Sequence, residues 1–331
     1  MRTRLAGAAL LAALAFPAAP PVRASSYLLY VELQGVAGYS TAARKAVFAS
    51  MSANEVMQKP SLGFDYVQRF SGATRDIAIL AIQGRLAWNA DGERSVEPQL
   101  YNAYLKLKTG LADIWVGHNK PKFGLSDALD NHGALLQPLS MMGFGFDRDW
   151  GVGLEREFAR GGAGLSLTTG TGMPLETKGT YLLAGRLTRN ILSQDNFSYG
   201  VSAALGSVGD YEGYEKMSDA PMKLLLAGAD LTWRRDTWEH SLEILAGNRD
   251  ERGALAVFWR TGVGLLEESR LKLEIQPVFI AARGESSLRL SAGVSYQPHP
   301  DWTFRAMAAY DGSMKDMKII FQFYYYKGIR L

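Results

Sequence analysis

The sequence has no cysteine, so neither disulfide bonds nor thiolate-bound metals can hold the fold together. It has no run of 18 apolar residues that could form a transmembrane helix, and no Pro/Ser-rich or single-charge segment that would separate domains. The four histidines, His118, His132, His240 and His299, form no H-x-x-x-H or H-E-x-x-H pattern, and no G-x-x-x-x-G-K-[ST] loop occurs. We therefore expect no metal, no cofactor and no enzymatic activity.

The N-terminus has the features of a signal peptide. A cationic head at residues 1–4 precedes an apolar run at residues 5–16, and prolines and the small-residue site Val22-Arg23-Ala24 follow. We expect cleavage after Ala24, which makes residues 1–24 a signal peptide and residues 25–331 one domain. A buried N-terminal helix is the alternative, and the prolines oppose it.

Charge on the mature chain is balanced. Loss of Arg2, Arg4 and Arg23 leaves 33 basic residues against the 33 acidic ones. Nucleic-acid binding would need a basic face or stripe, so we expect no nucleic-acid partner.

Hydrophobicity in the mature chain alternates with a period of two. In residues 286–297 the apolar side chains share one parity, and residues 302–311 repeat the pattern after a turn. This predicts a hairpin with one apolar face, in either a membrane barrel or a soluble sandwich. Tyr296 and Trp302 flank the turn, and Tyr310 lies about 20 Å beyond Trp302 along a membrane normal, close to the spacing of aromatic girdles. We therefore favour the membrane barrel.

Similar segments recur along the whole chain. They predict an all-β fold, a transmembrane antiparallel β-barrel of about 16 strands with a range of 14 to 18, with short periplasmic turns and longer external loops. The expected external loops include residues 40–60, 89–98, 120–148, 171–179 and 208–221. The expected strands are residues 27–39, 61–70, 76–88, 99–109, 111–119, 149–157, 163–170, 180–189, 197–207, 222–234, 237–248, 254–266, 270–282, 286–297, 302–311 and 316–331.

Charged residues on the polar parity are candidates for the lining of a pore. A charge facing lipid would cost about 2–4 kcal/mol at the bilayer midplane, so charges are expected to face the lumen. Their slight basic excess predicts a mild anion preference at most. The candidate pore-lining residues are Arg69, Arg85, Lys106, Lys108, Asp113, Glu155, Arg186, Arg260, Lys272, Arg289 and Arg305.

Two passages resemble known outer-membrane proteins. Trp115-Val-Gly-His-Asn-Lys-Pro-Lys-Phe-Gly-Leu125, followed after a loop by Asp147-Arg-Asp-Trp-Gly-Val, resembles a passage of the phosphate-selective porin O and P type. The resemblance covers residues 99–156. Those proteins have Pro-Phe-Gly where this chain has Pro121-Lys122-Phe123-Gly124, and no dense run of basic residues follows, so phosphate specificity is not carried over. The C-terminal strand is also amphipathic, as in outer-membrane barrels, but it ends in Leu331 where Phe is usual.

The resemblance implies that the third external loop folds into the barrel and narrows it. Its charges are mixed, which gives no clear preference for one ion. The candidate constriction residues are Lys120, Lys122, Asp127, Asp130, His132, Asp147, Arg148 and Asp149.

These features predict a bacterial outer-membrane porin, surrounded by outer-membrane lipid, through which small hydrophilic solutes or ions diffuse passively and with weak selectivity. A homotrimer is expected from the resemblance alone. One alternative is a barrel that sheathes a periplasmic partner such as a multihaem electron carrier. That carrier would be another protein, because this chain lacks C-x-x-C-H. A barrel hydrolase is a third possibility, which the scattered histidines oppose.

Overall fold

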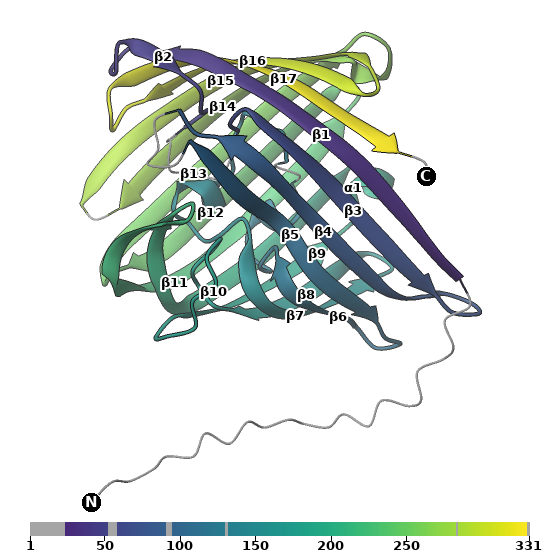
Figure 1. The fold of residues 1–331 in the computed structure, drawn as a ribbon. Coiled ribbons are helices and arrows are strands. Elements are labelled where there is room, and N and C mark those ends of the chain that lie inside the picture. Colours follow the sequence, from purple (N-terminus) through teal and green to yellow (C-terminus); the bar gives the residue numbers. More distant parts are fainter. Residues whose placement is uncertain (1–23, 52–57, 91–94, 130–131, 283, 330–331) are drawn as a thin grey trace, which may run out of the picture.

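A computed structural model describes residues 24–51, 58–90, 95–129, 132–282 and 284–329. These residues form a closed antiparallel β-barrel of 16 strands (Figure 1). The predicted fold class and strand number are therefore confirmed. The expected signal peptide lies outside the described residues, apart from Ala24 at the start of the first strand, and stays a prediction.

Nearly every strand pairs with its neighbours in the sequence, as in an up-and-down barrel. The exception is β2, a three-residue strand within the first external loop that pairs only with the end of β1. The strands are β1 Ala24–Ser40, β2 Lys45–Val47, β3 Ser61–Ser71, β4 Asp76–Trp88, β5 Val96–Lys108, β6 Asp113–Asn119, β7 Asp149–Phe158, β8 Gly161–Thr168, β9 Tyr181–Arg189, β10 Phe197–Glu212, β11 Glu215–Arg235, β12 Trp238–Arg249, β13 Arg252–Leu265, β14 Leu271–Ala282, β15 Glu285–His299, β16 Trp302–Asp311 and β17 Asp316–Ile329.

The helical segments are single turns in the connections. They are η1 Leu125–Asp127, η2 Leu139–Met142, α1 Leu192–Asp195 and η3 Glu267–Ser269. Among the described residues, no helix is both long enough and apolar enough to cross a membrane.

The barrel closes where β1 meets β17. Their ladder runs from the pair Leu29 and Ile329 to the pair Ser40 and Lys318, while the other edge of β1 pairs with β3. Inside this seam the rings of Tyr30 and Tyr326 stack with centroids 4.6 Å apart. The sheet of the described residues therefore closes on itself, which is the condition for placing strands in lipid.

The prediction of an external loop at residues 208–221 is wrong. Most of these residues belong to β10 and β11, which continue as one long hairpin with its turn at Gly213 and Tyr214. Residues 214–221 are exposed on both parities. Because water surrounds both faces of this extension, the sequence there has no alternation to reveal a strand, although the backbone ladder persists.

Long external connections occur only in the first half of the barrel. The segments 41–60, 89–95, 120–148 and 169–180 are long, whereas the later external connections are residues 213–214, 250–251, 283–284 and 312–315. The expectation of longer external loops thus applies to one side of the mouth.

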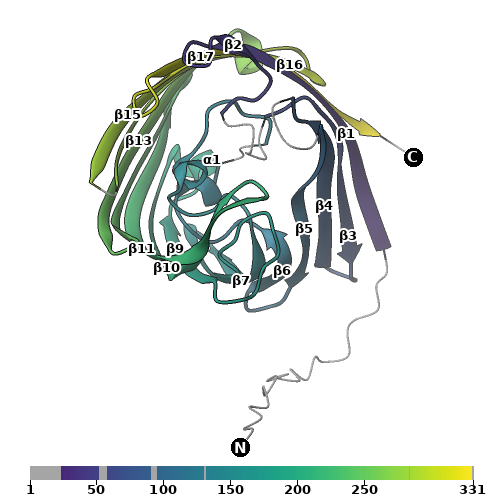
Figure 2. The ribbon, with the colours of Figure 1, turned by 60° about the vertical axis from the view of Figure 1, so that its left-hand side comes forward.

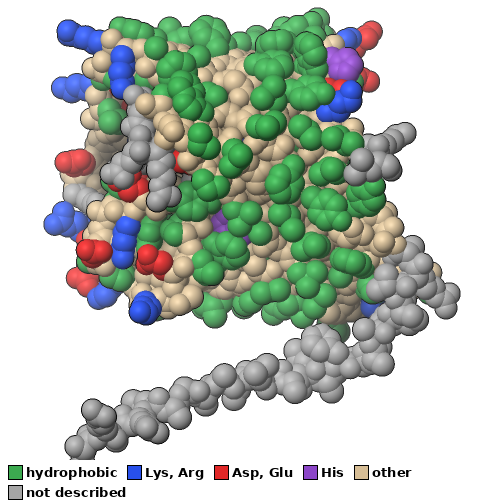
Figure 3. Space-filling model, in the orientation of Figure 1, with side chains coloured by type: hydrophobic (Ala, Val, Ile, Leu, Met, Phe, Trp, Pro, Cys, Tyr) green, Lys and Arg blue, Asp and Glu red, His purple; other side chains and the backbone are tan. Residues whose placement is uncertain are grey.

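The outer wall is apolar. Figure 3 shows hydrophobic side chains across the barrel wall and charged side chains gathered towards its two ends. Tyr296, Trp302 and Tyr310, the expected girdle residues, are 44%, 45% and 41% exposed on this wall. Such an arrangement suits a hydrocarbon layer bounded by aromatic side chains.

Candidate functional site

Residues 120–148, here called the 120–148 loop, leave the wall between β6 and β7 and fold into the lumen (Figure 2). Phe123, Leu125, Leu139 and Phe144 of this loop are buried against inward-facing apolar side chains of the barrel wall. These wall residues include Leu182, Leu226, Leu245 and Phe258. The inner wall is thus apolar where the loop covers it, and removal of this surface from water holds the loop inside.

Glu243 on β12 anchors the loop with a hydrogen bond. Its Oε1 accepts a hydrogen bond from the Leu125 backbone N–H at 2.6 Å, and Glu243 is buried. The preceding Gly124 has φ +63° and ψ −172°, a conformation that only glycine adopts readily. A Cβ at Gly124 would lie 2.4 Å from the same carboxylate oxygen, so the contact also requires that residue 124 has no side chain.

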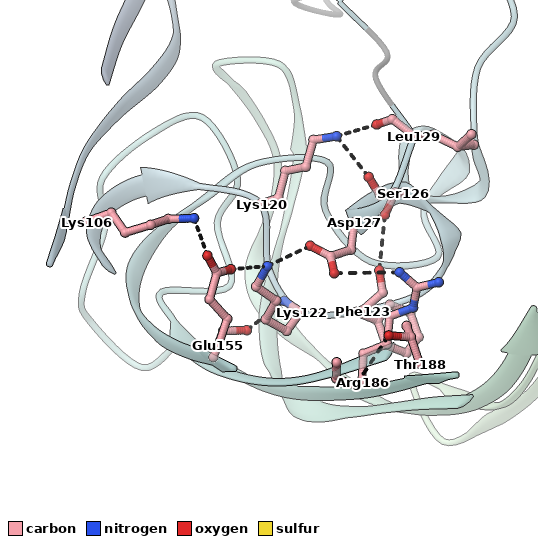
Figure 4. A network of polar contacts seen from close by, with 12 residues as sticks. Lys106, Lys120, Lys122, Phe123, Ser126, Asp127, Leu129, Glu155, Arg186 and Thr188 are labelled. Carbon is pink, nitrogen blue, oxygen red and sulfur yellow. Dashed lines mark hydrogen bonds and ion pairs between the residues drawn. The ribbon is translucent and has the colours of Figure 1, made fainter. Parts of the chain in front are cut away.

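Five charged residues from the loop and the wall meet in one network, here called the basic-acidic cluster (Figure 4). Lys122 Nζ lies 3.0 Å from Asp127 Oδ1 and 2.6 Å from Glu155 Oε2, and Lys106 also pairs with Glu155. Arg186 Nη1 lies 3.6 Å from Asp127 Oδ2. The cluster therefore joins two candidate constriction residues to three candidate lining residues from β5, β7 and β9.

The two carboxylates hold Lys122 in its charged state. Burial disfavours the ammonium, but Asp127 and Glu155 outweigh it, so the pKa of Lys122 is raised above its ordinary value. Because this pKa is raised, the Lys122 ammonium stays charged throughout the acidic and neutral pH range. It loses its proton only above the pH at which lysine normally titrates.

Lys120 shapes the loop from within. Its ammonium donates to the carbonyl oxygens of Ser126, at 3.1 Å, and Leu129 (Figure 4). It thus closes the turn that contains η1 and is separate from the basic-acidic cluster.

A second polar group lies where the loop approaches β1, β4 and β5. His132 Nε2 contacts the Glu32 carboxylate, and Arg85 Nη1 lies 3.5 Å from the other oxygen of Glu32. The guanidinium of Arg148 sits 4.1 Å from the Tyr101 ring centroid and also pairs with Asp147. The candidate residues His132, Asp147 and Arg148 therefore lie in the lumen beside wall residues.

Asp149 has a structural position at the start of β7. Its carboxylate accepts hydrogen bonds from the Gly170 N–H at 2.7 Å, the Thr169 hydroxyl at 2.8 Å and the Gly172 N–H at 3.1 Å. It therefore fixes the start of the 169–180 loop and is not available to solute. Asp130, the remaining candidate, lies outside the described residues.

The other lining candidates share the inward register along their strands. Arg260 donates to the Leu136 carbonyl at 3.0 Å and so braces the loop. Lys272 pairs with Glu274 at 2.9 Å, Arg289 with Asp311 at 3.0 Å, and Arg305 donates to the Gln322 amide oxygen at 2.9 Å. Lys108 and Asp113 face each other across the ladder of β5 and β6, and Arg69 is exposed at the periplasmic end of β3.

Sequence reasoning missed the neutral polar residues of the lumen. Gln276 donates to the Gln137 carbonyl at 2.9 Å, and Asn102 accepts from Arg148 at 2.9 Å. Both lie on the polar parity of their strands. A search for all polar inward positions, not only charged ones, would have found both residues, because Asn102 shares the parity of Lys106 and the register shift of β5 lies before it.

Cavities lie on both sides of the 120–148 loop, and two of them are on its periplasmic side. A periplasmic vestibule of about 670 Å³ reaches from Lys122 and Asp127 down to Phe158 and Asn190. A second periplasmic recess of about 340 Å³ is lined by four basic residues and one acidic residue. Within the described part of the chain, no three His, Cys, Asp or Glu side chains come together as a metal site.

Comparison with known proteins finds no matching family model and no matching curated protein. Several solved structures are similar. The trimer form of OmpT, an outer membrane protein of Vibrio cholerae, has a TM-score of 0.66 at 12% identity, over 92% of this chain and 100% of that one. An anion-selective porin from Comamonas acidovorans has a TM-score of 0.65 at 9% identity, over 92% and 100%. Salmonella typhi OmpF, in complex with daunomycin, has 0.64 at 9%, over 91% and 97%.

Proposed function

We propose that the chain is an outer-membrane porin in which water and small hydrophilic solutes or ions pass the 120–148 loop by diffusion. The similar structures support the barrel architecture alone, because their identity to this chain is only 9–12%. The observation that carries this proposal is the loop anchored in the lumen, with the basic-acidic cluster on one side and cavities before and after it. The candidate lining residues then act as the walls of the path, as the inward parity of their strands suggests.

We further propose a weak preference for anions. The periplasmic recess below residues 134–136 is lined by Arg260, Arg270, Lys272 and Arg305 against a single acid, Glu274. The basic-acidic cluster is closer to neutral, because its three cations face two carboxylates and Arg186 also pairs with Asp230 at 2.6 Å. The recess therefore favours anions slightly, but the described lining forms no continuous basic ladder of the kind that strict selection would need.

Location and assembly belong to the same proposal. The fold and the apolar outer wall support insertion in the bacterial outer membrane after cleavage near Ala24, with lipid around the wall. A homotrimer is supported by the description of one similar structure as a trimer form. Membership of the phosphate-selective O and P type still rests only on the resemblance of residues 99–156. The sheath alternative has less support, because the loop reaches from β12 to β1 across the space that a periplasmic partner would fill.

Planar-bilayer recording of the refolded mature chain in a KCl gradient tests the proposal. A porin gives stable conductance steps with a small reversal potential of anion sign. Absence of steps from a barrel that is folded, as judged by heat-modifiable gel migration, would overturn the open-pore proposal. A large reversal potential of anion sign would indicate strict anion selection and not a weak preference.

A further inference from the structure

A separate recess of about 480 Å³ opens at the external mouth beside the 120–148 loop. Its outer side is the inner face of β14 to β17, and its inner side is the loop at residues 135–142. Ser50 and Met51 of the first external loop and Glu212, at the end of β10, complete it. Its volume is in the range of sites for small organic molecules.

Methionine is the most frequent residue type in the lining. Five of the 11 methionines in the sequence line this one recess, namely Met51, Met141, Met142, Met307 and Met314. Methionine side chains are unbranched, flexible and polarisable, so a surface made of them adapts to apolar groups of different shape. Leu135, Val278 and Ala309 extend the apolar part. An apolar surface inside an otherwise polar mouth favours a solute with an apolar body.

The charges around the recess favour a cation. Arg289 is paired with Asp311, at 3.0 Å. The Asp316 carboxylate accepts hydrogen bonds from the Ser40 hydroxyl, at 2.9 Å, and from the Ala42 backbone N–H, at 2.9 Å.

Lys318 donates to the backbone carbonyl of Met51. The carboxylate of Glu212 has no ion pair or hydrogen bond with any described residue, and this side chain is half-buried. The lining holds two cations and three carboxylates, so a bound cation would restore its charge balance.

We infer that this recess binds organic cations with an apolar body, of the arylalkylammonium class, with the apolar body against the methionines and the ammonium group beside Glu212. The inference goes beyond the pore, because binding requires the folded barrel but no conduction through it. It also assigns a role to the long β10–β11 hairpin, which places Glu212 in the recess.

Methionine methyl signals provide a direct test. The mature chain is labelled with [methyl-¹³C]methionine, refolded in detergent and titrated with 2-phenylethylammonium chloride. The methyl signals of Met51, Met141, Met142, Met307 and Met314 are expected to shift along one saturable curve. The signals of Met173, Met217 and Met317, which do not line the recess, are expected to stay in place and so report any general partitioning into the micelle.

Two control compounds separate the parts of the ligand. 3-Phenylpropionate has the same ring with an anionic group, and ethylammonium has the charge without the ring. Each is expected to bind more weakly than 2-phenylethylammonium. Equal shifts with 3-phenylpropionate would overturn the role of charge, and equal shifts with ethylammonium would overturn the role of the apolar lining.

Variants locate the site. Glu212→Gln is expected to weaken binding about fivefold, in the range of a partly exposed ion pair. The matched control is Glu215→Gln, because Glu215 is exposed directly opposite Glu212 in the hairpin and does not line the recess. Met142→Gln should also weaken binding, whereas Met217→Gln should not.

The result is independent of the porin proposal. Saturable methionine shifts from a barrel that conducts no ions would keep this inference and overturn the pore. Conductance steps without these shifts, or an affinity unchanged in Glu212→Gln, would overturn this inference and keep the pore.

Discussion

Gly124 and Glu243 together determine how the 120–148 loop meets the wall. The glycine supplies a backbone conformation and an empty space, and the carboxylate fills that space to reach the Leu125 amide. A hydrogen bond contributes about 0.5–1.5 kcal/mol, and a buried N–H that loses its acceptor costs about 1–3 kcal/mol, so this contact helps to hold the loop in place.

Gly124→Ala should displace the loop at this point. The substitution adds backbone strain of about 1–3 kcal/mol and places a Cβ against the Glu243 carboxylate. We expect a lower urea midpoint of unfolding and less uniform conductance steps. Gly179→Ala is the matched control, because Gly179 has φ +78° but no atom within 4 Å of the added Cβ. Equal effects of the two substitutions would mean that Glu243 does not hold the loop.

Lys122→Met should change ion preference without a large change in pore size. It removes the cation between Asp127 and Glu155 and leaves their negative charge in the basic-acidic cluster. The reversal potential should move towards cation preference. Lys178→Met, in the exposed part of the 169–180 loop, is the control and should have no effect. An unchanged potential in Lys122→Met would place the ion path away from this cluster.

At residue scale, the sequence predicts orientation better than it predicts contacts. The period of two placed residues such as Arg186 and Glu155 on the inward parity, because a strand alternates its faces regularly. No such rule governs the path of a loop. The pairing of Lys122 with Glu155, or of His132 with Glu32, joins residues far apart in the sequence, so it could not be derived from spacing.

Among the elements, the extension of the β10–β11 hairpin was not predicted from the sequence. Its extension curves over the external mouth (Figure 2). At its tip the Tyr214 hydroxyl accepts a hydrogen bond from the Leu100 N–H of β5 at 2.9 Å. The ladder between β5 and β6 begins only at Ala103, so the hairpin tip meets β5 beyond the reach of β6.

Tyr214→Phe should loosen this tip. The loss removes one hydrogen bond, worth about 0.5–1.5 kcal/mol, and exposes the Leu100 amide to water. Hydrogen exchange at Leu100 should become about tenfold faster, which corresponds to the upper end of that range. Tyr296→Phe on the outer wall is the control and should leave Leu100 unchanged. Unchanged exchange in Tyr214→Phe would show that the tip is held by other contacts, such as Lys216 with Glu176.

The strands within the apolar band were predictable because lipid and lumen impose opposite requirements on alternate residues. The ends of the strands were less predictable from the sequence. Outside the band both faces meet water, and β11 therefore begins at Glu215, seven residues before the expected 222.

For the whole molecule, the proposed anion preference should depend on salt. The Debye length falls from about 10 Å at 0.1 M to about 3 Å at 1 M, so charges on the wall act at a distance only in dilute salt. We expect the permeability ratio of Cl⁻ to K⁺ to approach unity between 0.1 and 1 M KCl, measured at a fixed ratio across the bilayer. A ratio that stays constant over this range would instead indicate a direct binding site for chloride.

The seam between β1 and β17 also constrains the order of folding. The loop can dock on β9 to β13 through Phe123 and Leu125 as soon as those strands exist. Its contacts with Glu32 on β1 and with the Tyr324 ring on β17, 6.0 Å from His132, need both ends of the barrel. The last steps of assembly are therefore coupled, because joining the first strand to the last also completes the inner lining of the mouth.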